Sequence, residues 1–154
     1  MVGAKPSSTP ISTNLKLDNT SGDILSDPFQ FRSLVRGLQY LTWTRPDISF
    51  SVNQVRQLLR EPRTHHLIAV KIILRYLKGT GNIGLVYRRN IFHLNAFGDA
   101  DWASSFNDRR STTNYCIYFG SNPISWPTKR QHTVARSSTE AEYRSLAHTA
   151  AEIC

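Results

Sequence analysis

The chain has 154 residues, with 19 Lys and Arg against 11 Asp and Glu and a formal net charge of +8. This length suits one domain or two small ones and excludes a large multidomain enzyme, while 40% hydrophobic residues exclude a disordered tail. The basic excess attracts polyanions, of which nucleic acid is the commonest, and the alternative is a solvated basic surface.

Three helices are predicted in the first half of the chain, after an extended polar lead-in over residues 1–28. Pro6 and Pro10 oppose a helix in the lead-in. Pro46 suits the first turn of the second helix, and Gly79 ends the third. Apolar residues recur at helical spacing in three segments, residues 29–41, 46–59 and 67–77.

A row of basic residues lies along one face of the third predicted helix. Lys71, Arg75 and Lys78 are spaced by four and three residues and therefore share one helix face. This spacing suits contact with the phosphates of a nucleic acid. A solvated face is the alternative interpretation.

The hydrophobic period changes from helical to alternating after Gly84, which predicts strands. A last helix is expected from Ser138. The order of helices, strands and one final helix predicts an α+β fold with a boundary near residues 79–84. Four short strands are predicted, at residues 85–87, 94–102, 115–119 and 124–126.

Acidic residues gather in one predicted strand and at the start of the last helix. Asp99 and Asp101 lie two apart on a strand and point to the same side, where carboxylates need a cation or a partner. Ser137 and Glu140 have the spacing of a capping box, which leaves Glu142 free, about 200° further around the helix. A strand aspartate opposite Glu142 is a half-site for Mg²⁺.

The two cysteines, Cys116 and Cys154, are too few and too far apart for a disulfide framework or a zinc site, and they fit a reducing compartment. No apolar run approaches the roughly 18 residues of a membrane span, and the first residues lack the apolar segment of a secretory signal. We therefore expect an intracellular protein, in the cytoplasm or nucleus, without a membrane partner.

Seven sequence blocks carry a family resemblance. They are FRSLV with LQYL in residues 31–41, TRPDI at 44–48, LRYLKGT at 74–80, DADWA at 99–103, DRRST at 108–112, ISW at 124–126 and SSTEAEY at 137–143. In this order and spacing the blocks resemble the Pol polyproteins of copia-type LTR retrotransposons. The resemblance extends over essentially the whole chain.

The resemblance implies that residues 29–82 are similar to the thumb and connection of a reverse transcriptase. Residues 83–154 are similar to the N-terminal part of a ribonuclease H domain, an incomplete mixed sheet with one helix. The ancestral activities are then RNA-directed DNA synthesis and Mg²⁺-dependent hydrolysis of RNA in RNA–DNA hybrids. The implied partners are such hybrids or DNA and the rest of the Pol polyprotein.

The same resemblance implies the catalytic, metal-binding residues. Asp99 corresponds to the first family carboxylate, and Glu142, in the pattern Glu-Tyr-Arg-Ser, to the second. Asp101 and Glu140 are then neighbours rather than ligands. The later family carboxylates follow this helix, so we expect a truncated fragment that is inactive as an isolated chain.

Two other hypotheses remain open: a non-catalytic basic module that binds nucleic acid, and a decayed open reading frame without a selected function. Arg36 replaces a family glycine and is expected to disturb packing. Four aromatic residues are expected to be core rather than platforms for stacked bases. They are Trp43, Tyr76, Tyr87 and Trp126.

Overall fold

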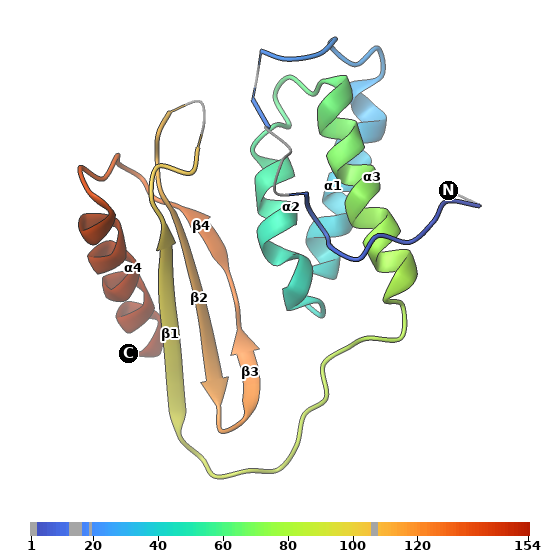
Figure 1. Ribbon diagram of the computed structural model, residues 1–154. Coiled ribbons are helices and arrows are strands. Elements are labelled where there is room, and N and C mark those ends of the chain that lie inside the picture. The colour runs from blue at the N-terminus through green and yellow to red at the C-terminus, as the bar shows by residue number, and fades with distance from the viewer. Residues whose placement is uncertain (1–2, 13–16, 19, 106–107) are drawn as a thin grey trace. The chain divides into compact units, whose positions relative to one another are not determined.

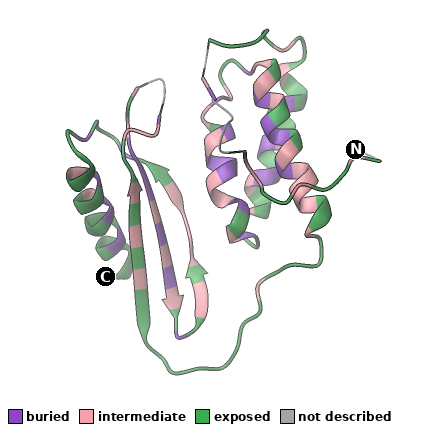
Figure 2. Ribbon diagram, in the orientation of Figure 1, coloured by how far each residue is buried: buried purple, intermediate pink, exposed green. Residues whose placement is uncertain are grey.

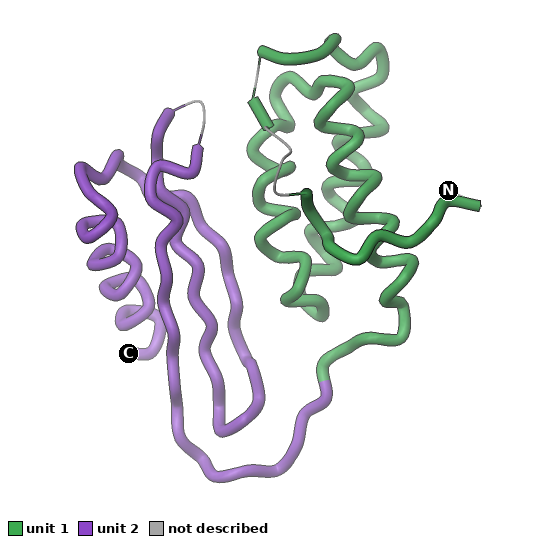
Figure 3. The backbone as a smooth tube through the Cα atoms, in the orientation of Figure 1, with its two compact units in different colours: residues 1–85 green, residues 86–154 purple. Residues whose placement is uncertain are grey.

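The computed structural model describes residues 3–12, 17–18, 20–105 and 108–154 (Figure 1). The chain divides into two compact units, unit 1 over residues 1–85 and unit 2 over residues 86–154 (Figure 3). Helices come first and a sheet with one helix follows, which confirms the predicted α+β class.

Unit 1 contains the three predicted helices. The Asp27 side chain accepts hydrogen bonds from the backbone N–H groups of Phe29 and Gln30, and Pro28 occupies the first helical position, so local sequence explains where the first helix begins. Pro46, predicted in the first turn of the second helix, instead begins a short 3₁₀ turn that leads into that helix. The elements are α1 (Pro28–Leu41), η1 (Pro46–Ile48), α2 (Ser49–Arg56) and α3 (Thr64–Gly79).

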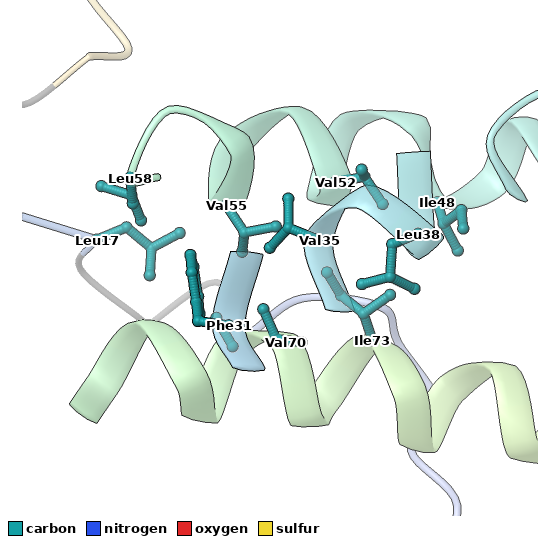
Figure 4. Close-up of a cluster of buried hydrophobic side chains, with 11 residues drawn as sticks. Leu17, Phe31, Val35, Leu38, Ile48, Val52, Val55, Leu58, Val70 and Ile73 are labelled. Atoms are coloured by element: carbon teal, nitrogen blue, oxygen red, sulfur yellow. The ribbon is translucent and has the colours of Figure 1, made fainter. Parts of the chain in front are cut away.

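A continuous apolar core holds the helices of unit 1 together (Figure 4). Phe31, Val35 and Leu38 supply the inward face of α1 at helical spacing. Leu17 of the lead-in also enters this core, so the lead-in is not only a polar spacer. The other buried members are Ile48, Val52, Val55, Leu58, Ala69, Val70 and Ile73.

A histidine fixes the lead-in against the start of α3. His66 is fully buried, and its Nδ1 accepts the backbone N–H of Arg63 at 3.0 Å. Its Nε2 therefore carries the proton and donates to the Asp18 carbonyl at 2.8 Å. Residues 1–2, 13–16 and 19 of the predicted lead-in lie outside the described residues.

Unit 2 is an antiparallel sheet with one helix, and two predictions need correction here. Residues 85–87 form no strand, and Val86 and Tyr87 are exposed. The strand β4, which pairs with β2, was not predicted. The path through the sheet is β1-β2-β3. The elements are β1 (Leu94–Asp101), β2 (Thr112–Phe119), β3 (Asn122–Ser125), β4 (Thr128–Arg130) and α4 (Ser138–Ile153).

Helix α4 packs on the sheet through small side chains. Figure 2 shows buried residues on the side of α4 that faces the strands. Ala141, Ser145 and Thr149, spaced by four residues, form its buried face. Ser145 Oγ donates to the backbone carbonyl of Asp99 at 2.7 Å. A Cβ atom at Gly98 would lie 2.6 Å from Thr149 Oγ1, so only glycine lets helix and strand approach this closely.

Candidate functional site

The two aspartates of β1 share one face of the sheet. Gly98 faces α4, so strand alternation directs Asp99 and Asp101 to the opposite face, where Asn114 and Thr112 are their partners on β2. Desolvation, followed by the charge of Asp99, raises the pKa of Asp101. The ionised form of Asp101 is therefore disfavoured by its burial and by its acidic neighbour.

The two glutamates of α4 have different environments. Ser137 Oγ accepts the Glu140 N–H at 3.1 Å, which confirms the predicted cap, while Glu140 reaches back to the Arg136 N–H at 2.7 Å, one residue before the cap. The bond from Arg136 is the largest cause of the lowered pKa of Glu140. Within the described residues, the exposed Glu142 makes no hydrogen bond or ion pair. The predicted division between a structural and a free glutamate therefore holds in its geometry.

The donor chemistry of these side chains fits Mg²⁺, which prefers hard oxygen ligands. Asp99 and Glu142 lie on two elements that pack directly against each other, but Asp99 points to the face of β1 away from α4, and Glu142 is exposed. No group of three potential ligands comes together in the described part of the chain. The residues present therefore suit part of a coordination shell, with the other positions filled by water or by other groups.

The predicted basic row lies on α3, but the structure divides it. Arg75 Nε donates to the Lys5 carbonyl at 2.6 Å, and Lys78 Nζ donates to the Ala4 carbonyl at 3.1 Å. The exposed Lys71 has no hydrogen bond or ion pair among the described residues. Two of the three cations thus hold the lead-in, and no carboxylate in the described ranges forms an ion pair with any of them.

An exposed aromatic surface on α1 was missed by the sequence prediction. Tyr40 and Trp43 are 78% and 79% exposed, so the expectation that Trp43 is core was wrong. They line a hollow of about 330 Å³ with Arg36 and Gln39, which we call the α1 aromatic surface. Arg36 is exposed and does not disturb packing, contrary to expectation. The helical spacing of Arg36 and Tyr40 could have revealed this second face of α1; Trp43 follows the end of the helix at Leu41.

An internal network joins two of the sequence blocks. Arg45, 8% exposed, forms an ion pair with Asp47 at 2.7 Å and donates to the Thr80 carbonyl at 3.0 Å. The Tyr76 hydroxyl donates to the same Asp47 carboxylate at 2.8 Å. The network ties η1 to the end of α3, so these residues support the fold of unit 1 rather than a site.

No helix in the described ranges combines the length and apolar character needed to cross a membrane. No family model and no solved structure matches the chain.

Curated relatives match almost the whole chain. It is 49% identical over 154 residues to the retrovirus-related Pol polyprotein from transposon RE1 of Arabidopsis thaliana, and 47% identical to that from transposon RE2; each match covers 99% of this chain. The chain spans about a tenth of these polyproteins, 10% and 11% of their lengths. It is also 49% identical to an uncharacterized mitochondrial protein of the same plant, covering 64% of that protein.

Proposed function

This chain belongs to the Pol polyprotein family of copia-type retrotransposons, and from that premise we propose that it joins the end of a reverse transcriptase to the start of a ribonuclease H domain. Unit 1 contacts nucleic acid, and unit 2 contributes two carboxylates to the hydrolysis of RNA in RNA–DNA hybrids. The observation that carries the proposal is the packing of β1, with Asp99, against α4, with Glu142. RNA-directed DNA synthesis belongs to the larger polyprotein.

In this proposal Asp99, on the face of β1 opposite α4, holds Mg²⁺ with ligands that these described residues do not supply, and Glu142 becomes a ligand only in the completed site. Two Mg²⁺ ions held at the completed site would supply the chemistry, one by activating a water molecule and the other by stabilising the charge on the leaving oxygen. Ser145 fixes the backbone of Asp99 through its carbonyl. Arg144 and the Arg136 N–H hold Glu140, which leaves Glu142 as the glutamate free to bind the ion.

Metal binding can be tested without activity by using Mn²⁺ as a paramagnetic probe in NMR spectra of the chain. Mn²⁺ is expected to broaden the backbone signals near Asp99 and Glu142. In Asp99→Asn, the Mn²⁺ concentration that produces the same broadening should be at least fivefold higher. Glu152→Gln is the matched control on α4, because Glu152 pairs with Lys129 instead. If the broadening is unchanged in Asp99→Asn, the metal assignment is rejected.

Hybrid cleavage supplies the second readout. With Mg²⁺ or Mn²⁺, the isolated chain is expected to cut an RNA–DNA hybrid poorly, because the described residues supply too few ligands. Any cutting should disappear in Asp99→Asn. Cutting that persists unchanged in this variant would show that the site lies elsewhere.

A non-catalytic nucleic-acid-binding module is the second candidate, and the α1 aromatic surface favours it. Two exposed rings can stack on unpaired bases while Arg36 meets a phosphate, and α1 carries no acidic residue to repel the strand. Lys71 adds to the same unit an exposed cation that pairs with no described residue. Binding is then expected to weaken steeply as salt rises.

Fluorescence anisotropy with labelled single strands and hybrids tests this candidate. Trp43→Ala is expected to raise the Kd for a single strand at least about fivefold, since stacking contributes about 1–3 kcal/mol per base. Phe29→Ala is the matched control, because Phe29 is an exposed ring at the other end of α1. Binding that is unaffected by salt and by Trp43→Ala would remove the candidate. Loss of binding with intact Mn²⁺ broadening would leave the metal proposal standing.

A further inference from the structure

Unit 2 contains a second hollow, of about 340 Å³, between α4 and the segment that follows β4. We call it the α4 basic pocket and propose that it binds a phosphate group. Cationic and hydrogen-bond-donating side chains converge on it from two elements, and no carboxylate lines it. Its lining residues are Gln131, His132, Thr133, Arg144, Ala147 and His148.

Arg144 is held in place before any ligand arrives. Its Nη1 donates to the carbonyl and hydroxyl oxygens of Thr133, and its Nη2 donates to Glu140 Oε1 at 2.6 Å. These bonds leave further guanidinium N–H groups to donate, because the group has five. Since the Thr133 hydroxyl accepts from Arg144, its own O–H is free to donate to a ligand. A guanidinium fixed in this way suits the planar, forked recognition of phosphate oxygens.

Two histidines complete the donor set. His132 comes from the segment after β4, and His148 lies one turn beyond Arg144 on α4; both are exposed. Each ring carries an N–H group that can donate a hydrogen bond to a bound anion. The nearby carboxylates are already engaged, Glu140 by Arg144 and Glu152 by Lys129 at 2.9 Å.

The inference does not rest on the proposed metal site. Glu142 precedes Arg144 by two residues and therefore lies about 200° away around α4. Gln131 forms the buried floor of the pocket, and its Nε2 donates to the Ala141 carbonyl at 2.9 Å and to Thr113 Oγ1 at 3.1 Å. The pocket is therefore seated on the hydrogen bonds that join α4 to the sheet.

The test follows the histidine ring signals of the whole chain by NMR at one fixed pH while inorganic phosphate is added. We expect saturable shifts of the His132 and His148 rings. His93 is the internal control, an exposed histidine of the same unit outside the pocket. His148→Gln should raise the apparent Kd for phosphate at least fivefold. Arg144→Lys keeps the positive charge but removes the forked pair of guanidinium donors, and it should raise the apparent Kd for phosphate by at least the same factor.

Two phosphate sources are distinguished by a second arm, in which an oligonucleotide without terminal phosphates replaces inorganic phosphate. Shifts of the same two rings, reversed by inorganic phosphate, identify a backbone phosphate as the ligand. Shifts with inorganic phosphate alone identify a free phosphate. Equal movement of His93, or no saturation in either arm, overturns the proposal. Because His148→Gln changes an exposed side chain, the test stands even if Arg144→Lys fails to fold.

Discussion

Replacing Gly98 with alanine tests how closely α4 is seated on β1. A Cβ atom at this position would lie 2.6 Å from Thr149 Oγ1 and 3.3 Å from Ser145 Oγ, whereas ordinary contacts begin near 3.4 Å. Thr149 cannot turn away freely, because its hydroxyl donates to the Ser145 carbonyl at 2.8 Å. Gly98→Ala therefore forces the helix and the strand apart by several tenths of an ångström.

Overpacking of this kind costs about 1–3 kcal/mol of unfolding free energy. For a unit of this size, each kcal/mol lowers the Tm by about 4–8 °C, so the transition of unit 2 should fall by roughly 5–20 °C. Calorimetry measures the fall, and hydrogen exchange of the α4 amides assigns it to unit 2. Gly84→Ala is the control, since a Cβ atom there meets nothing within 4 Å.

Thr149→Ala should relieve the clash, because it removes the atom nearest the new methyl group. The double variant is expected to be more stable than the two single effects predict, by about 1 kcal/mol or more, as residues in contact couple. The reasoning is refuted if Gly98→Ala unfolds at the parent temperature. It is refuted equally if the two substitutions are additive.

Three further predictions concern unit 1. Phe31→Ala removes a fully buried ring and should cost about 3–5 kcal/mol in urea unfolding, against little change for the exposed Phe29→Ala. The hydrogen bond from Arg45 is the main cause of the lowered pKa of Asp47. The ionised Asp47 therefore stabilises unit 1 above the unfolded pKa of about 3.9, and this stabilisation is lost as the pH falls through the folded pKa. Asp47→Asn should flatten this acid limb of the curve of unfolding free energy against pH. Burial lowers the pKa of His66. The unfolded state therefore binds a proton at this imidazole first, and the unfolding free energy of unit 1 should decline as the pH falls below about 6.5. In NMR the His66 ring should titrate below its ordinary pKa.

Local signals explain the parts of the fold that the sequence predicted well. The start of α1 follows from the Asp27 cap and Pro28, and α3 ends at Gly79 as expected. These features depend on neighbouring residues, so a short stretch of sequence contains them. The strand predicted at residues 85–87 failed, because alternating apolar residues form a strand only when a partner strand lies beside them. Whether a partner strand lies there depends on residues far away in the sequence, so a short stretch of sequence does not reveal it.

The candidate sites show the same division. Helical spacing correctly placed Lys71, Arg75 and Lys78 on α3, but it could not show that the lead-in docks there and takes up two of them. Trp43 was expected in the core because large aromatics usually are. The inward face of α1 is already filled by other residues, which leaves Trp43 outside with Tyr40.

The contrast between the two cores bears on where chemistry can reside. Unit 1 closes its core with apolar side chains, whereas α4 meets the sheet through the hydroxyls of Ser145 and Thr149 and the amide of Gln131. Hydrogen bonds at such an interface fix positions more narrowly than apolar contacts do, because each requires a defined distance and angle. The hydrogen bond from Ser145 to the Asp99 carbonyl therefore fixes the backbone of Asp99 from the side of α4. The Asp99 side chain remains on the opposite face of β1. A strand that is positioned from one side and exposed on the other is suited to present carboxylates to a ligand, as the proposed metal site requires.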